Sequence, residues 1–152
     1  MTYIDSSAVV PLYVPERFST AARTVVQDVG QIPFTALHRL EVPNAFELLV
    51  GRGSITPEEC RAILQHVQDD LESQRLMQVA LDLERVFVDA GELSRRYTAK
   101  LLARGLDLLH VAAAHHALCK TFVSADDRQL AAAKASGLTV VDIKRRIRRR
   151  RR

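Results

Sequence analysis

The amino-acid sequence predicts an α/β domain, a three-layer sandwich in which a mostly parallel central sheet is flanked by helices on both faces. The first observation is that short apolar runs alternate with helical patterns across short connections, as in parallel sheets with crossover helices. The second is the length of 152 residues, which matches one domain core. The third is the composition of 47% hydrophobic and 26% charged residues, which excludes a disordered or fibrous chain.

The first half of the chain is predicted to hold two strands and the helices that follow them. Thr2 to Asp5 is a short apolar run closed by an acid. From Phe18 to Val29 the apolar residues recur at spacings of three and four, and Gly30 ends this amphipathic helix. The predicted elements are strand 2–5, a short helix or turn ending near Pro15, helix 18–29, strand 31–35 and helix 37–49.

The second half opens with a strong helix start, in which Thr56 is the cap, Pro57 the first helical residue and Glu59 the partner in a capping box. Gly91 is a weak point in the following helical segment or a break between two helices. Residues 106–118 are rich in Leu and Ala on all sides, so we expect a buried helix that also buries Asp107. The predicted elements are helix 57–72, strand 77–81, helix 83–103, helix 106–118, strand 121–124, helix 128–136 and strand 138–141.

The net charge of +4 belongs to the C-terminal end of the chain. Eight of the last nine residues are Lys or Arg, and the rest of the chain holds 14 cations against 18 anions. We therefore divide the sequence into a slightly acidic domain, residues 1–142, and a basic arginine-rich tail, residues 143–152. The tail is interpreted as an anchor for a nucleic-acid backbone, as a solvated end, or as an added sequence without a role.

Several classes of protein are excluded by what the sequence lacks. It has no run of 18 apolar residues and no basic segment followed by a long apolar one, so we expect neither a membrane span nor a secretory signal, and a cytoplasmic location. Cys60 and Cys119 stand outside any CxxC motif, which gives no support to a disulfide framework or a zinc knuckle. No phosphate-binding loop, nucleophile elbow or zinc-protease histidine pair is present.

Four acidic residues stand at positions that either a ligand-binding role or an ordinary structural role, such as helix capping, would explain. Asp5 and Asp126 follow predicted strands, so they are expected at the carboxyl edge of the sheet, where ligands bind in such folds. Asp107 opens a helix, and any of these three aspartates taken alone is explained as well by helix capping. Glu41 lies in an apolar helical stripe, where an ionised carboxylate needs a partner, such as an arginine.

A shared site would explain all four acids together. Close carboxylates repel one another and raise one another's pKa values unless a cation neutralises them. Oxygen ligands select a hard ion, which favours Mg²⁺, with Mn²⁺ as a possible substitute. Hydrolysis of phosphodiester bonds is the natural chemistry of such a centre.

Four segments of the sequence resemble the acidic motifs of PIN-domain ribonucleases, most closely those of VapC-type toxins from toxin-antitoxin pairs. The segments are Y-I-D-S-S, L-E-V-P-N-A-F, L-D-L-L-H-V-A-A-A and F-V-S-A-D-D-R-Q-L, and they follow in the family's order from Tyr3 to about Val141. The resemblance implies a PIN-like fold and four catalytic acids that bind the metal: Asp5, Glu41, Asp107 and Asp126.

The same resemblance implies roles for the neighbours of these acids. Ser124 and Asp126 stand where the family has Thr/Ser-x-Asp, which favours Asp126 over Asp127 as the ligand and leaves Asp127 as a helix cap. Ser7 falls where the family often has Asn or Ser close to the metal, so both serines are expected to support the ligands. His110 matches the family's D-x-x-H and is expected to form hydrogen bonds inside the fold.

The function implied by the resemblance is a metal-dependent endoribonuclease. It would be the toxin of a type II toxin-antitoxin pair, a homodimer that cuts tRNA, rRNA or mRNA and is neutralised by a cognate antitoxin. Because the domain is net acidic, RNA would be held by local arginines, for which Arg17, Arg39 and Arg52 are candidates, by the tail and by the metal. The residues that bind RNA are otherwise unknown.

Three other functions stay open on the sequence alone. The first is a non-catalytic PIN-like module that binds RNA or a protein and uses its acids only as caps. The second is a nuclease for branched or flapped DNA, although a chain of 152 residues leaves little room for a DNA-gripping region. The third is a ribonuclease that uses paired histidines and the RNA 2′-OH, which would need no metal.

Overall fold

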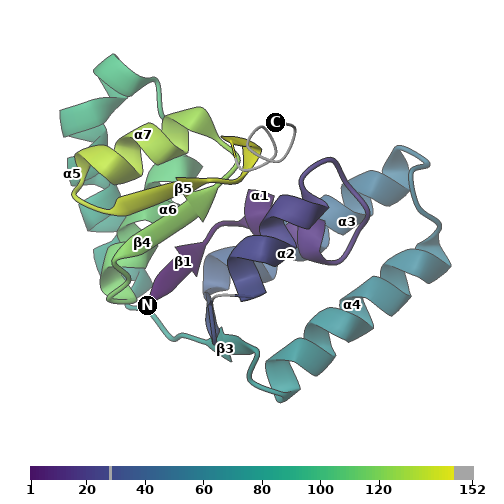
Figure 1. Cartoon of the computed structure of the whole chain (residues 1–152). Coiled ribbons are helices and arrows are strands. Elements are labelled where there is room, and N and C mark those ends of the chain that lie inside the picture. Colours follow the sequence, from purple (N-terminus) through teal and green to yellow (C-terminus); the bar gives the residue numbers. More distant parts are fainter. Residues whose placement is uncertain (28, 146–152) are drawn as a thin grey trace.

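The computed structural model describes residues 1–27 and 29–145, in which strands and helices alternate as predicted (Figure 1). The strands are β1 (Thr2–Ile4), β2 (Ile32–Phe34), β3 (Leu76–Gln78), β4 (Thr121–Ser124) and β5 (Thr139–Asp142). The helices are α1 (Ser6–Val9), the 3₁₀ helix η1 (Val10–Leu12), α2 (Ser19–Gln27), α3 (Ala36–Gly51), α4 (Pro57–Glu72), α5 (Leu83–Leu101), α6 (Gly105–His116) and α7 (Asp127–Ala135).

The strands form two parallel ladders. In one, β1 pairs with β4 and β4 with β5, so that Ile4 lies opposite Val123. In the other, β2 pairs with β3. The end of β1 is also bonded to α3, the helix that follows β2, because the His38 ring forms a hydrogen bond with the Ile4 carbonyl. The carboxyl ends of β1, β2 and β4 therefore meet at one edge, as expected for a parallel sheet.

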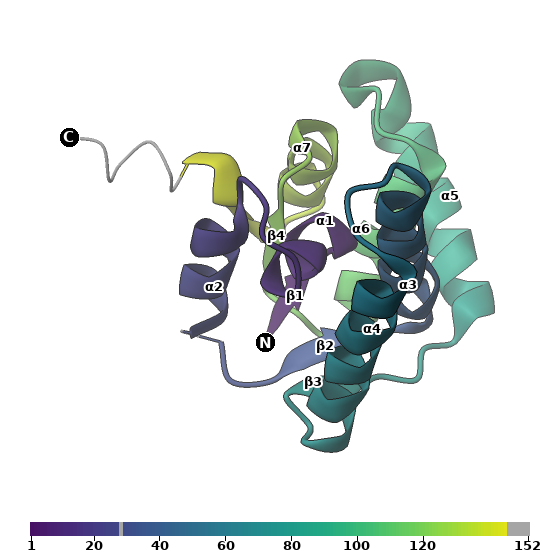
Figure 2. The ribbon, with the colours of Figure 1, turned by 90° about the vertical axis from the view of Figure 1, so that its right-hand side faces the viewer.

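Two apolar cores, one on each face of the strands, account for the three layers. Successive strand residues point to opposite faces, so Tyr3 and Phe122 enter one core while Ile4 and Val123 enter the other. The first core packs against α5, α6 and α7, and the second against α1, α2, α3 and α4. Figure 1 shows α5 to α7 on one side of β1 and β4, and Figure 2 shows α3 and α4 side by side. The predicted three-layer α/β fold is confirmed.

The structure confirms one predicted helix start and settles one predicted weak point in a helix. The capping box of α4 is formed, with the Glu59 amide donating to Thr56 Oγ1 at 3.1 Å and the Thr56 amide donating to Glu59 Oε2 at 2.7 Å. At Gly91 the prediction left a break open, but α5 is continuous from Leu83 to Leu101. The packing of α5 along α6 supports the helix on both sides of the glycine.

The C-terminal segment begins inside the folded body. Ile143, the first residue of the predicted tail, is fully buried in the second core. Lys144 pairs with Asp127 at 2.7 Å and Arg145 with Asp142 at 3.3 Å. The rest of the tail, residues 146–152, lies outside the described residues.

Two further expectations concern the cysteines and the membrane. Cys60 and Cys119 are free thiols, and both are buried. Among the helices of the described chain, none is both long enough and apolar enough to cross a membrane.

Candidate active site

Asp5 stands at the end of β1 with its side chain withdrawn from solvent. The residue is only 5% exposed, and Ser7 Oγ donates a hydrogen bond to Asp5 Oδ1 at 2.8 Å. Although Asp5 precedes α1, its side chain makes no capping bond, so capping does not explain this acid. Burial raises its pKa to about 6, and the nearby Glu41 charge acts in the same direction. A buried carboxylate without a structural task is typical of a functional site.

Glu41, on α3, is held by two donors through one of its oxygens. Ser6 Oγ donates to Glu41 Oε2 at 2.7 Å, and His110 Nε2 forms a hydrogen bond with the same oxygen. Burial opposes ionisation of the carboxyl, but the hydrogen bond and charge of His110 outweigh it and lower the pKa of Glu41. The partner that the sequence argument required is therefore a histidine from α6, and no arginine in the described part of the chain pairs with Glu41.

Asp107 and Asp126 both perform the capping role that the sequence left open. Asp107 Oδ2 accepts the Arg104 amide at 2.8 Å at the start of α6. The side chain is partly exposed, so the expectation that α6 would bury its acid is wrong, because Asp107 lies in the first turn at the rim of the core. Asp126 is exposed, and its Oδ1 accepts the amides of Arg128 and Gln129 at 2.8 and 3.1 Å.

The resemblance left Asp127 as the cap of the last long helix, and the structure contradicts that assignment. Asp126, rather than Asp127, caps α7. Asp127 is the first residue of the helix, and its carboxylate bonds Lys144, which lowers the pKa of Asp127. The reason is geometric, because a cap needs the extended backbone that Asp126 has just before the first helical residue.

Ser7 and Ser124 lie together after β1 and at the end of β4, but only Ser7 bonds a predicted carboxylate, since Ser124 Oγ donates to Gln129 Oε1 at 2.8 Å. The hydroxyl oxygens of the two serines lie 3.4 Å apart. Ser7 Oγ also accepts the Ala125 amide at 3.0 Å, and Ser124 Oγ accepts the Asp126 amide at 2.9 Å. The two serines thus lie beside Asp5 and Asp126, where they fix the ends of β1 and β4 against each other.

A buried polar network under Glu41 was not foreseen in the sequence. Tyr3 Oη lies 2.8 Å from His110 Nδ1 and 3.4 Å from Thr35 Oγ1. His38 accepts the Thr35 amide at Nδ1, so its Nε2 donates to the Ile4 carbonyl at 2.8 Å. Burial lowers the pKa of His38 to about 3, which keeps that ring neutral. Only His110 was selected in the sequence, through the D-x-x-H pattern. Its partners in the network are far from it along the chain, so no local motif connects them.

A cleft of about 430 Å³ opens beside Glu41. Ser6, Ser7 and Glu41 supply hydrogen-bonding groups to its lining, and Phe18 and Leu48 supply apolar surface. The cleft also contains Glu16 and Asn44, which the sequence analysis did not select, because Glu16 sits in a loop without a motif. The remaining lining residues are Val10, Ala45 and Ala125.

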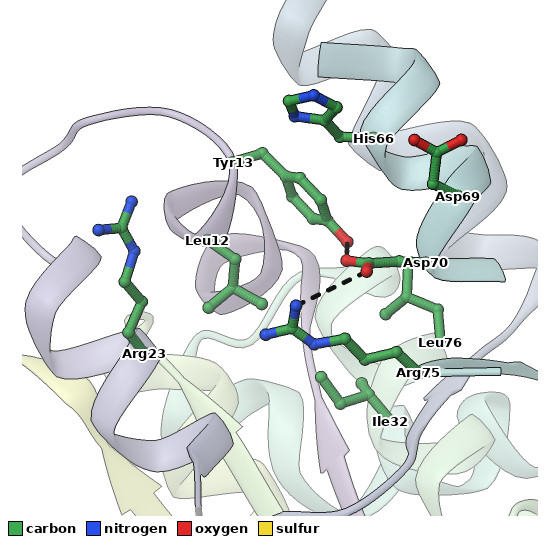
Figure 3. A pocket seen from close by; sticks show the side chains of 9 residues that line it. All are labelled: Leu12, Tyr13, Arg23, Ile32, His66, Asp69, Asp70, Arg75 and Leu76. Carbon is green, nitrogen blue, oxygen red and sulfur yellow. Dashed lines mark hydrogen bonds and ion pairs between the residues drawn. The ribbon is translucent and has the colours of Figure 1, made fainter. Parts of the chain in front are cut away.

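A second hollow, of about 470 Å³, is lined by residues of η1, α2, α4, β2 and the start of β3 and shares none with the first (Figure 3). Its acids are engaged within the fold. Tyr13 Oη donates to Asp70 Oδ2 at 2.6 Å, Arg75 lies 3.6 Å from the other oxygen of Asp70, and Gln65 donates to Asp69 at 2.9 Å. These bonds tie η1, α4 and β3 together, which is a structural task.

The oxygen ligands at the sheet edge suit a hard divalent ion. In each of the four predicted acids, one carboxylate oxygen accepts hydrogen bonds from a serine, a histidine or a backbone amide. Among the described residues, no side chain donates to the second carboxylate oxygen. Asp5 and Glu41 are the pair close enough for their charges to interact. No three Asp, Glu, His or Cys side chains among the described residues are close enough to share an ion. Mg²⁺ needs only one or two carboxylates and otherwise keeps its waters, so the Asp5 and Glu41 pair fits this ion.

The α/β architecture is PIN-like, and the comparison with solved structures supports this fold. No protein-family model matches the sequence, and no curated protein does. Among solved structures, the chain is similar to FitAcB from Neisseria gonorrhoeae, with a TM-score of 0.68 and 11% identity over 95% of this chain and 99% of that one. It is also similar to Mycobacterium tuberculosis VapC20, a Sarcin-Ricin loop cleaving toxin, with a TM-score of 0.64 and 16% identity over 93% and 99%.

A third structure, FitAB bound to the IR36 DNA fragment, has a TM-score of 0.66 and 11% identity over 94% of this chain and 95% of that one. These neighbours are PIN-domain proteins of the VapC toxin type. The resemblance predicted from the four motifs is thus confirmed at the level of the fold.

Proposed function

We propose that the chain is a metal-dependent endoribonuclease that hydrolyses RNA phosphodiester bonds and acts as the toxin of a type II toxin-antitoxin pair. The observation that carries the proposal is the pair of Asp5 and Glu41. Both side chains are held by hydrogen bonds at the carboxyl edge, each through one oxygen, and the Glu41 side chain opens into the cleft. The structural similarity to an RNA-cleaving toxin supports RNA as the substrate.

Mg²⁺, or Mn²⁺ in its place, would be held by Asp5 and Glu41, with Asp107 and Asp126 at the margins of the site. When bound, such an ion lowers the pKa of a coordinated water and neutralises charge on the scissile phosphate. The residues of this chain orient the ligands: Ser7 holds Asp5 Oδ1, and Ser6 holds Glu41 Oε2. No side chain is required as a nucleophile.

A cognate antitoxin follows from the toxin function, because a cell must neutralise a ribonuclease that attacks its own RNA. The structural similarity to VapC20, which is described as a toxin, supports this class of partner. A homodimer is part of the same proposal. A sedimentation mass near 17 kDa across working concentrations would contradict the dimer without touching the catalytic proposal.

The deciding experiment is end-mapped cleavage of total cellular RNA by the purified protein with Mg²⁺ and with a chelator. Glu41→Gln and Asp107→Asn test the site, and Asp89→Asn is the matched control, because Asp89 is an exposed helical carboxylate whose partner among the described residues is the half-buried His116. We expect discrete cuts that the chelator and Glu41→Gln abolish and Asp89→Asn preserves.

The alternative is a non-catalytic PIN-like module that binds RNA or a protein. The capping bonds of Asp107 and Asp126 favour it, because these acids have structural tasks of their own. Absence of cutting together with absence of Mg²⁺ or Mn²⁺ binding in calorimetry would establish the module. Cleavage that survives the chelator would support the histidine mechanism instead, and preferential cleavage of flap DNA would support the DNA nuclease.

A further inference from the structure

His110 is a buried histidine whose two ring nitrogens both have partners. It is 1% exposed, its Nδ1 lies 2.8 Å from Tyr3 Oη, and its Nε2 bonds Glu41 Oε2. Tyr3 is itself fully buried between the two histidines, with its ring 5.1 Å from that of His38 and 5.8 Å from that of His110. The imidazole therefore has one orientation, set from the core side.

The Glu41 carboxylate, by contrast, is not fixed by surrounding core side chains as the His110 ring is. Its side chain is 24% exposed and faces the cleft, and a glutamate loses considerable rotamer freedom when it is fixed. Ser6 also holds Oε2, but a serine hydroxyl turns freely about its Cβ–Oγ bond and follows the carboxylate. Of the two donors, only the His110 ring can dictate where the carboxylate lies.

The four groups form a chain from the core to the cleft: Thr35, Tyr3, His110 and Glu41. Burial raises the pKa of the Tyr3 hydroxyl, so Tyr3 remains a hydrogen-bond donor at all working pH values. Nε2 carries a proton that points at Glu41 whether the ring is neutral, with Tyr3 donating to Nδ1, or charged, with Nδ1 donating to Tyr3 Oη. A carboxylate held through Oε2 in this way directs Oε1 to the open side.

We propose that His110, fixed by Tyr3, is a positioning residue that holds the Glu41 carboxylate with Oε2 engaged and Oε1 presented to the cleft. The inference rests on the proposed function only in that Oε1 would then be a metal ligand. The arrangement of the chain's own groups is independent of any ion. His110 does not touch substrate, and its effect passes entirely through Glu41.

Two substitutions at His110 separate positioning from packing. In His110→Gln the side-chain amide reaches the place of Nε2 and still donates to Glu41. In His110→Asn the shorter amide reaches only the place of Nδ1, so Tyr3 keeps a partner and Glu41 keeps Ser6 as its donor but loses the donor from α6. The matched control is His116→Asn, which removes the bond of 2.7 Å to Asp89 at the C-terminal end of the same helix.

The first readout is the Mn²⁺ dissociation constant measured by calorimetry. We expect His110→Asn to weaken Mn²⁺ binding by about 10- to 100-fold, the usual effect of losing a group that orients a metal ligand. His110→Gln should stay close to the wild-type protein, and His116→Asn should equal it. Equal Mn²⁺ affinity in the wild-type, Asn and Gln proteins, or an equal loss in both His110 variants, would overturn the positioning role.

The second readout is the crystal structure of the metal-free His110→Asn protein, which decides the inference even if the wild-type protein binds no metal. We expect the Glu41 carboxylate to leave its place beside Ser6 or to occupy several rotamers, while α6 and Tyr3 stay in place. An unmoved Glu41 would overturn the proposal. Tyr3→Phe provides a second variant, in which the His110 ring loses its anchor and Glu41 should disorder to a smaller extent.

Discussion

Replacing Asp5 with Asn is expected to stabilise the metal-free protein at neutral pH, although Asp5 is the central acid of the proposed site. Burial raises the pKa of Asp5 from 3.8 to about 6, so the folded state binds this proton more tightly than the unfolded chain does. At 1.36 kcal/mol for each pKa unit, the ionised Asp5 costs about 3 kcal/mol of folding free energy above pH 6. Asn keeps the shape and accepts the Ser7 hydrogen bond without a charge.

The sign of the pH dependence follows from the same shift. Below the unfolded pKa of 3.8 both states carry the proton, and the ionisation cost is absent. As the pH rises to about 6 the unfolded chain loses its proton first, so the wild-type protein loses stability relative to Asp5→Asn. Above pH 6 the difference is constant.

The assay is urea unfolding of the wild-type protein and Asp5→Asn at pH 4, 5, 6 and 7.5 in the presence of a chelator. The stability advantage of the variant should grow from near zero at pH 4 to about 3 kcal/mol at pH 7.5. A difference that is independent of pH, or a variant that is less stable at pH 7.5, would refute the reasoning.

Asp127→Asn is the control with the opposite sign. Lys144 lowers the pKa of Asp127, so its ionised form favours the folded state and the variant should be less stable at neutral pH. Added Mg²⁺ extends the test to the proposed function. Mg²⁺ should stabilise the wild-type protein, because an ion that binds only the folded state raises the free energy of unfolding. Asp5→Asn lacks this ligand, so Mg²⁺ should leave the stability of the variant unchanged.

Three further predictions concern other parts of the molecule. Gly91→Ala should stabilise α5 by about 1 kcal/mol in thermal unfolding, because the position is inside a continuous helix and a Cβ there meets no atom within 4 Å; a loss of stability would show that the glycine is required. Tyr13→Phe should cost about 1–2 kcal/mol in urea unfolding and leave RNA cleavage unchanged, because it removes the bond to Asp70 in the second hollow; a loss of cleavage would connect the two hollows. Deletion of residues 146–152, which include six arginines, should flatten the dependence of log K for RNA binding on log salt by up to about 4; an unchanged slope would remove the tail from RNA binding.

The success of the element predictions has a local cause. Strand alternation, helical spacing and the Thr56 capping box depend on residues no more than a few positions apart, so they are readable along the chain. The same locality explains the two errors near the site. Whether Asp126 or Asp127 caps α7 depends on one backbone conformation, and the exposure of Asp107 depends on how far the core extends along α6.

The sequence by itself determined the α/β class, the order of its elements and the position of four acids at strand ends and in helices. Only the tertiary structure decided which groups hold them. Glu41 and His110 are 69 positions apart, and Tyr3 and His110 are 107 apart. Such pairs form because two apolar cores press the helices against both faces of the strands. The burial that raises the pKa of Asp5 has the same origin, since no local pattern states how much water a folded chain excludes.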